Sequence, residues 1–174
     1  MRNNIILCGF MGCGKTTVGK ILADRLRYTF IDTDIFIEQR ENMIVSEIFK
    51  EKGEPYFRNL ETEVTENLGE QDGLVIATGG GMMLDPKNAQ NLNKTGLSFW
   101  IKITPETVLK RLDGDTTRPL LQRDDKEQAV RELIAKREPL YAAACRFNID
   151  GEADAATVAE RIIKIINIDR PSFT

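Results

Sequence analysis

The sequence of 174 residues contains no histidine. If the protein is an enzyme, its general base must then be a carboxylate, a lysine, a tyrosine, a thiol or the substrate itself, and triads built on imidazole are excluded. Only three cysteines are present, at Cys8, Cys13 and Cys145. Their odd number and the absence of a C-x-x-C pair argue against a disulfide framework and against a zinc site. We therefore expect reduced thiols.

The chain also lacks an excess of positive charge and a long apolar run. Its net charge of -3 and its pI near 5.2 leave no basic field for nucleic acid. No apolar stretch approaches the roughly 18 residues that span a bilayer. The first residues, "MRNNIILCGF", run straight into a strand pattern instead of a cleavable signal. We expect a cytoplasmic monomer that binds neither nucleic acid nor membrane.

What the chain does have is a regular alternation of strand-length apolar runs with helical periodicity. This alternation predicts an α/β fold, with a doubly wound parallel sheet between two helical layers, as one domain over residues 1–174. Helical stripes of apolar residues follow the first strand, precede the third and follow the fifth. The five predicted strands lie near residues 4–8, 28–32, 73–78, 97–103 and 146–149.

The stretch "GFMGCGKTT" directly follows the first strand. Gly9, Gly14, Lys15 and Thr16 satisfy the pattern G-x-x-x-x-G-K-[ST], between a strand and an amphipathic helix as a P-loop requires. Backbone N–H groups and the helix N-terminus would face the phosphates, Lys15 would contact the β and γ groups, and Thr16 would ligate Mg²⁺. Cys13, within this loop, is either an unusually acidic thiol or a small residue that fills a tight turn. The motif predicts a nucleoside triphosphate with magnesium.

Three kinds of P-loop protein remain to be separated. A regulatory GTPase needs a D-x-x-G step, which the chain lacks, and a complete N-K-x-D motif, which "NKTG" is not. An ATPase module would carry an acidic pair after an apolar strand, but "LVIATGGG" ends in glycines. A small-molecule kinase is the interpretation that remains.

Two carboxylates follow the second strand in "FIDTDIF". Alternation along a strand would put Asp32 and Asp34 on one side, at the sheet edge where doubly wound folds bind ligands. One of them would help to hold Mg²⁺ and the other would meet an acceptor hydroxyl. Alternatively, Asp34 is the N-cap of the helix that follows.

Three further features suggest an acceptor pocket. Gly79, Gly80 and Gly81 remove side chains where a ligand could approach the backbone, unless they are only a flexible turn. Arg137 lies on the apolar face of its predicted helix and needs a carboxylate from the protein or from a ligand. Arg58 is spaced so that Glu61 could orient it, although a surface ion pair would look the same. Residues 33–61 are the predicted substrate-binding region.

The polar stretch "DGDTTRPLLQRDD", residues 113–125, separates two helical patterns. Its length favours a lid over a simple connector, although an ordinary charged surface loop is the alternative. Arg118 in this stretch would reach the transferring phosphoryl group as an arginine finger, or would be a solvated loop arginine.

Taken together, "GFMGCGKTT", "DTD", "FRNLE", "TGGG", "RPLL" and "KREPLYAAA" resemble the shikimate kinase family, in this order and over nearly the whole chain. The resemblance implies a nucleoside-monophosphate-kinase-like fold with strand order 2-3-1-4-5. It also implies transfer of the γ-phosphate of ATP to the 3-hydroxyl of shikimate. Kinases of the same fold that act on gluconate or on nucleoside monophosphates are the alternatives, and a P-loop nucleotide-dependent switch is the non-enzyme one.

The family's site residues carry over to matching positions in this chain. The implied shikimate set is Asp34, Arg58, Gly79, Gly80, Gly81 and Arg137, with the arginines on the substrate carboxylate. The implied nucleotide set is Gly12, Cys13, Gly14, Lys15, Thr16, Thr17, Arg111 and Arg118, with Arg111 near adenine. Thr16 and Asp32 would lie on the magnesium side, and Asp34, Lys15 and Arg118 would be catalytic.

Overall fold

The computed structural model describes residues 4–114 and 124–169. Five parallel strands form one sheet in the order β2-β3-β1-β4-β5, which confirms the predicted fold. The strands are β1 Asn4–Cys8, β2 Thr29–Asp32, β3 Leu74–Ala77, β4 Gly96–Lys102 and β5 Phe147–Asp150. Each begins and ends within two residues of its predicted position.

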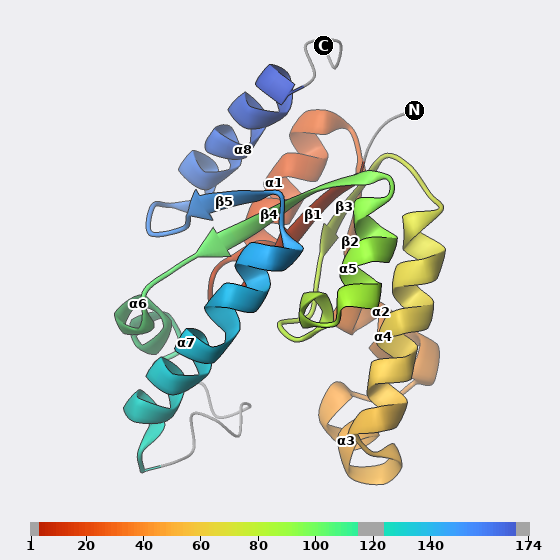
Figure 1. Cartoon of the computed structure of the whole chain (residues 1–174), viewed down its shortest axis with the longest axis vertical. Helices are drawn as coiled ribbons and strands as arrows, with labels where there is room; N and C mark the ends of the chain where they lie inside the picture. Colours follow the sequence, from red (N-terminus) through yellow and green to blue (C-terminus); the bar gives the residue numbers. More distant parts are fainter. Residues whose placement is uncertain (1–3, 115–123, 170–174) are drawn as a thin grey trace.

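Helices cover both faces of this sheet (Figure 1). They are α1 Lys15–Leu26, α2 Thr33–Glu41, α3 Val45–Lys52, α4 Glu54–Gly69, α5 Pro86–Asn93, α6 Pro105–Arg111, α7 Lys126–Ala144 and α8 Ala155–Asp169. A short 3-10 turn, η1, spans Met82–Leu84. Within the described part of the chain no helix combines the length and the apolarity needed to cross a membrane.

The alternation of side chains along β1 divides the core into two layers. Ile5 and Leu7 pack with residues of α1 and α8 on one face, whereas Ile6 and Cys8 pack with residues of α4 and α5 on the other. These positions are at most 1% exposed, because parallel strands are buried on both faces.

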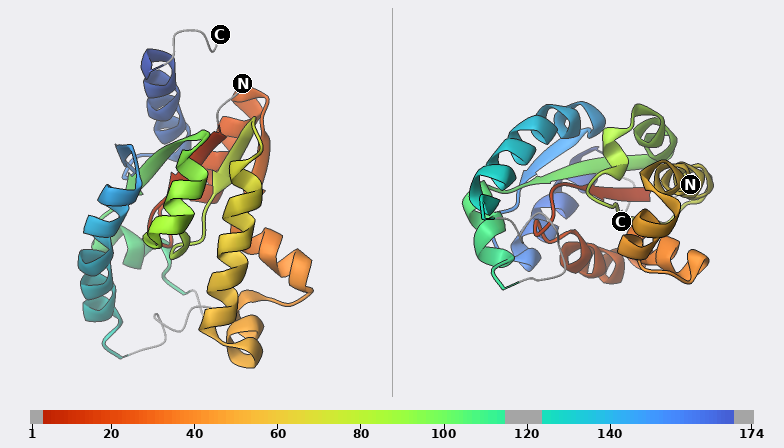
Figure 2. Two further views of the ribbon diagram at one scale, coloured as in Figure 1. Left: turned by 45° about the vertical axis from the view of Figure 1, so that its right-hand side comes forward. Right: turned by 90° about the horizontal axis from the view of Figure 1, so that it is seen from below.

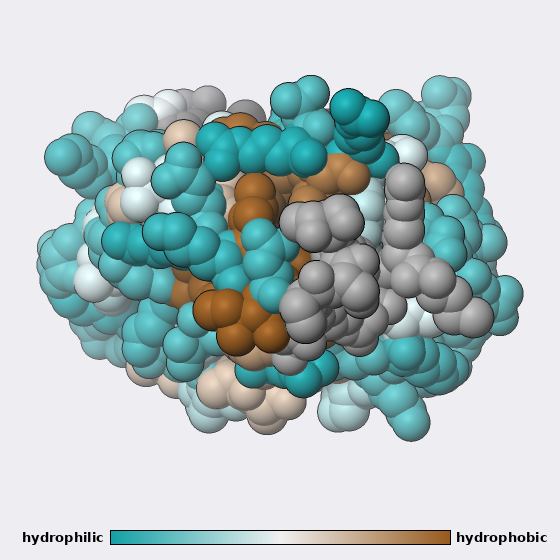
Figure 3. Space-filling model, turned by 90° about the horizontal axis from the view of Figure 1, so that it is seen from above, coloured by the Kyte–Doolittle hydropathy of each residue, from teal (hydrophilic) through white to brown (hydrophobic). Residues whose placement is uncertain are grey.

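The carboxyl ends of the strands define the working edge of the sheet. The β1–α1 connection, the β2–α2 junction and the turn after β3 all lie there, and Figure 2 (right) views the molecule from this side. Figure 3 shows the opposite end, where hydrophilic residues surround a smaller hydrophobic area. In open α/β sheets, ligands bind at the carboxyl edge.

Candidate active site

A cavity of about 660 Å³ opens at this edge. Every predicted site residue that the structure describes lines it: Gly12, Cys13, Gly14, Lys15, Thr16, Thr17, Asp32, Asp34, Arg58, Gly79, Gly80, Gly81, Arg111 and Arg137. Phe49 and Phe57 line the same cavity. Arg118 and most of the predicted lid, residues 115–123, lie outside the described residues.

The connection between β1 and α1 has the backbone of a phosphate-binding loop. Gly9, Gly12 and Gly14 adopt φ values of 146°, 76° and 92°, which side-chain-bearing residues rarely adopt. The Lys15 ammonium donates to the carbonyls of Gly9, at 2.8 Å, and Phe10, at 3.1 Å. It is thereby held over the loop, beside the N-terminus of α1.

Cys13 takes the role of a small packing residue. Its side chain is 2% exposed and belongs to the core layer that contains α1. A Cβ added at Gly9 would lie 2.9 Å from the Cys13 sulfur, so the turn has no room for a side chain at position 9. The Cys13 thiol is therefore closely packed.

Two oxygen ligands meet beside the P-loop. The Thr16 hydroxyl donates to Oδ2 of Asp32 at 2.9 Å. A hydroxyl and a carboxylate are the hard oxygen donors that Mg²⁺ prefers. In phosphoryl-transfer sites, one or two such protein ligands are enough to bind Mg²⁺, because waters and substrate phosphates supply the others. Among the described residues no three His, Cys, Asp or Glu side chains gather into a metal site. The Thr16–Asp32 pair fits a Mg²⁺ ion whose other ligands are nucleotide phosphates and waters.

The relation between Asp32 and Asp34 differs from the prediction. Strand β2 ends at Asp32 and α2 begins at Thr33, so the two carboxylates do not share one face of a strand. Asp32 is the N-cap of α2 and accepts from the backbone N–H groups of Asp34, at 3.2 Å, and Ile35, at 3.5 Å. The alternative that Asp34 caps this helix is therefore wrong. Asp34 lies in its first turn and lines the cavity.

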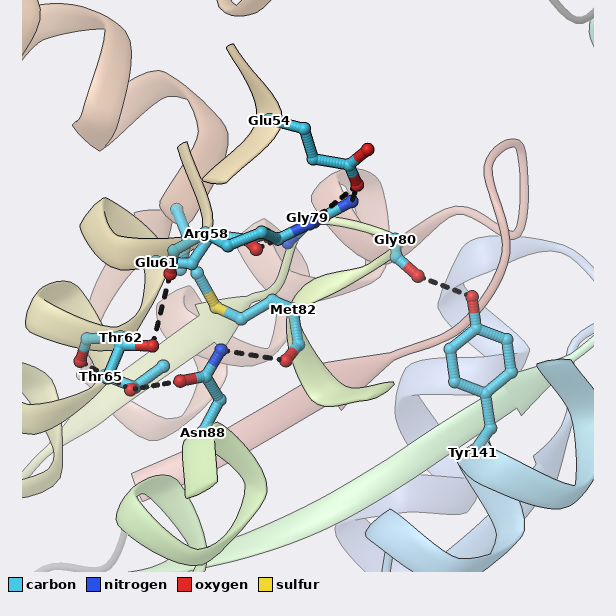
Figure 4. A network of polar contacts seen from close by, with 11 residues as sticks. Glu54, Arg58, Glu61, Thr62, Thr65, Gly79, Gly80, Met82, Asn88 and Tyr141 are labelled. Atoms are coloured by element: carbon cyan, nitrogen blue, oxygen red, sulfur yellow. Dashed lines mark hydrogen bonds and ion pairs between the residues drawn. The ribbon is translucent and has the colours of Figure 1, made fainter. Parts of the chain in front are cut away.

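Arg58 is held by two carboxylates of its own helix (Figure 4). Its guanidinium donates to Glu61 at 2.8 Å and to Glu54 at 2.8 Å. Burial opposes the charge on Arg58, but hydrogen bonds and attraction from Glu61 and Glu54 outweigh it and raise the pKa of the guanidinium. Glu61 is 1% exposed, so its ion pair with Arg58 is no ordinary surface pair.

Burial raises the pKa of Glu61 above its usual value, and the charges of Asp34 and Asp85 add to the rise. The pair with Arg58 opposes this shift. Truncating Arg58 would leave an uncompensated buried carboxylate, which is costly. Glu61 and Arg58 therefore act as one unit at the cavity wall.

Arg137 projects from the buried side of α7. Ile134 and Val130, one and two turns earlier on the same face, are buried, as the spacing predicts. The guanidinium lies over the Phe10 ring, 5.6 Å from its centroid, and faces the cavity. A cation in this setting is ready to accept a carboxylate from a ligand.

The turn after β3, Gly79 to Gly81, hereafter the glycine loop, lies against all three acceptor-side residues. A Cβ added at Gly79 would lie 2.4 Å from Oδ1 of Asp34. At Gly80 the nearest atom would be Nη1 of Arg137, at 3.8 Å, and at Gly81 it would be Nη1 of Arg58, at 2.7 Å. At Gly79 and Gly81 the missing side chains make room for the protein's own side chains.

Arg111 joins the P-loop to the loop after β5. Its guanidinium donates to the carbonyl of Gly12 at 3.2 Å and to that of Gly151 at 3.0 Å. The cavity extends past it to Asp154 and Ala155, at the start of α8. Arg111 therefore links the P-loop to the part of the cavity wall that follows β5.

Comparisons with known proteins agree with this geometry. A family model described as shikimate kinase matches residues 11–167. The chain belongs to the shikimate kinase family. As a member of this family it is an ATP-dependent kinase.

Relatives of the shikimate kinase family match almost the entire chain. A shikimate kinase of Caldanaerobacter subterraneus is 44% identical over 92% of this chain and 94% of its own, and one of Persephonella marina is 42% identical over 93% and 98%. The solved shikimate kinase of Acinetobacter baumannii, in complex with shikimate, has a TM-score of 0.91 at 37% identity over 98% of this chain and 96% of its own. A gluconokinase of Sinorhizobium meliloti, with a TM-score of 0.56 at 13% identity, shares the fold alone.

Sequence reasoning missed two residues at the site, Thr33 and Tyr141. Both are hydrogen-bonded to the glycine loop. Tyr141 follows Arg137 by one helical turn, and this spacing was the only sequence feature that placed it near the site. A buried tyrosine is equally typical of an ordinary hydrophobic core, so the spacing alone did not indicate a role.

Proposed function

We propose that the protein transfers the γ-phosphate of ATP to the 3-hydroxyl of shikimate, which gives shikimate 3-phosphate and ADP. This reaction is the fifth step of the shikimate pathway to chorismate and the aromatic amino acids. The observation that supports this assignment best is that Arg58 and Arg137 line one cavity beside Asp34, around a loop without side chains. A small acid with hydroxyl groups matches this arrangement of two cations and one carboxylate.

The substrate carboxylate binds between the two guanidinium groups. Arg58 is already paired with Glu61 and Glu54, so it offers its remaining N–H groups in a fixed orientation. Arg137 comes from α7 and lies beside Gly80 of the glycine loop, whereas Arg58 lies beside Gly81. This grip leaves the alcohol side of the ring facing Asp34 and the P-loop.

The triphosphate lies in the P-loop, where backbone N–H groups and Lys15 contact its β and γ groups. Gly12, Cys13, Gly14 and Thr17 contribute to this cradle, and Arg111 borders the adenine. When bound, Mg²⁺ neutralises charge on the phosphates, and Thr16 and Asp32 would hold it. One such ion per active site is the proposed cofactor.

Asp34 orients the 3-hydroxyl and takes up its proton as the new bond forms between the hydroxyl oxygen and the γ-phosphorus. The bond from that phosphorus to the β–γ bridging oxygen breaks in line, and ADP leaves. Lys15 compensates the charge on the transferring group, and Arg118 is proposed to do so from the 113–125 lid.

A coupled ADP-release assay with shikimate, gluconate and AMP, offered separately at equal concentration, tests this function. We expect turnover with shikimate at a rate well above the ATPase background. Turnover confined to AMP or to gluconate would assign the protein to another kinase of the same fold. No turnover with any of the three would favour a nucleotide-dependent switch.

A further inference from the structure

Two buried hydroxyl groups hold the glycine loop in place. The Thr33 hydroxyl accepts the backbone N–H of Gly79 at 2.9 Å. The Tyr141 hydroxyl donates to the carbonyl of Gly80 at 2.6 Å, as Figure 4 shows. Thr33 is 0% exposed and Tyr141 is 2% exposed, so water cannot replace either bond without a local rearrangement.

Each hydroxyl comes from the helix that carries one of the acceptor-side residues. Thr33 opens α2 and directly precedes Asp34. Tyr141 is four residues after Arg137 on α7, so the two lie on one helix face. The two hydrogen bonds therefore tie the glycine loop to the helices that present Asp34 and Arg137.

The loop is also the element against which these side chains rest. Asp34 abuts Gly79 and Arg58 abuts Gly81, both more closely than an added methyl group would allow. A shift of the loop would change the spacing of Asp34, Arg58 and Arg137 together. A rigid loop is needed because the site must bind the carboxylate of a small acid and orient its hydroxyl group at the same time. Both are possible only if these distances are fixed.

We propose that Thr33 and Tyr141 are positioning residues for shikimate, which act through the glycine loop without touching the substrate. This inference rests on the proposed function. Tyr141 is further fixed by its ring, whose centroid lies 6.0 Å from that of Trp100. Its hydroxyl is thus part of a rigid unit behind the acceptor pocket.

The test compares Tyr141→Phe and Thr33→Val with the wild type and with Ser98→Ala. Both test variants keep nearly the shape of the side chain and remove one hydroxyl group. Ser98 is a matched control, because it is 0% exposed and its hydroxyl accepts the backbone N–H of Arg146 at 3.0 Å in the sheet interior. It does not line the cavity.

We expect each test variant to raise the KM for shikimate about five- to tenfold, the usual effect of one lost hydrogen bond. For Tyr141→Phe the KM for ATP should stay within about twofold of wild type. Ser98→Ala should lower the urea midpoint and leave both KM values unchanged. Should Tyr141→Phe fail to fold, Thr33→Val gives the same measurement from the other side of the loop.

The inference is overturned if the folded test variants keep a KM for shikimate within about twofold of wild type. A urea midpoint lowered as in Ser98→Ala would then show that the two hydroxyl groups have a purely structural role. The wild-type enzyme is assayed first. If it does not phosphorylate shikimate, both the proposed function and this inference are refuted. A wild type that turns over shikimate beside unaffected variants refutes only the positioning role.

Discussion

Replacing Gly79 by alanine should separate catalysis from folding. The added methyl carbon would lie 2.4 Å from Oδ1 of Asp34, whereas ordinary contacts begin at 3.4 Å, so the carboxylate must move by about 1 Å. Gly79 has no positive φ, so its backbone accepts alanine without strain. A misplacement of about 1 Å at a reacting group costs on the order of 10²-fold in rate, or about 2.7 kcal/mol of activation free energy.

The assay is coupled ADP release at saturating ATP and shikimate, with urea unfolding measured in parallel. We expect kcat to fall about 100-fold while the free energy of unfolding changes by less than about 1 kcal/mol. Ser98→Ala is the control, since this buried change lies outside the cavity and should leave kcat unchanged. A Gly79→Ala enzyme that keeps kcat within threefold of wild type would refute the placement of Asp34 at the reacting hydroxyl.

Three further perturbations probe other parts of the site. Arg137→Lys should raise the KM for shikimate at least tenfold in initial-rate assays, because an ammonium cannot make the bidentate contact, while the exposed neighbour change Lys136→Arg should have no effect. Asp32→Asn should raise the Mg²⁺ concentration for half-maximal rate at least tenfold in a metal titration, unlike the surface change Asp24→Asn. Because burial raises the pKa of Glu61, its native form binds a proton more readily than its unfolded form, so its contribution to stability falls as the pH rises above 4.5. Urea unfolding across this range should show Glu61→Gln gaining stability relative to wild type with rising pH, and a constant difference would contradict the shift.

Hydrophobic periodicity sufficed to predict the five strands, since each short apolar run is bounded by helical patterns. The signal is strongest in β1, β3 and β4, which are almost wholly buried, whereas the edge strands β2 and β5 are more exposed. It failed at the β2–α2 junction. The sequence "DTD" alternates like a strand, but the Asp32 carboxylate captures the N–H groups of the next turn and starts a helix at Thr33. Local capping there outweighs the period-two pattern.

The acceptor site was predictable in part. A lone arginine on an apolar helix face marks a functional cation, because an unpaired buried charge is too costly, and Arg137 lies at the cavity accordingly. The roles of Thr33 and Tyr141 depend on contacts with a loop 46 and 61 residues away along the chain, which no local pattern encodes. The finger role of Arg118 stays a prediction.

The most direct test of the two-arginine grip compares shikimate with its uncharged primary carboxamide. The carboxylate makes two charge-assisted contacts with the arginines, each worth about 1.5 to 3 kcal/mol, and the carboxamide loses them. We therefore expect kcat/KM for shikimate to exceed that for its carboxamide by a factor of about 10² to 10⁴. In Arg137→Met this preference should shrink at least tenfold, with the amide little affected. Equal use of acid and amide by the wild-type enzyme would contradict the account.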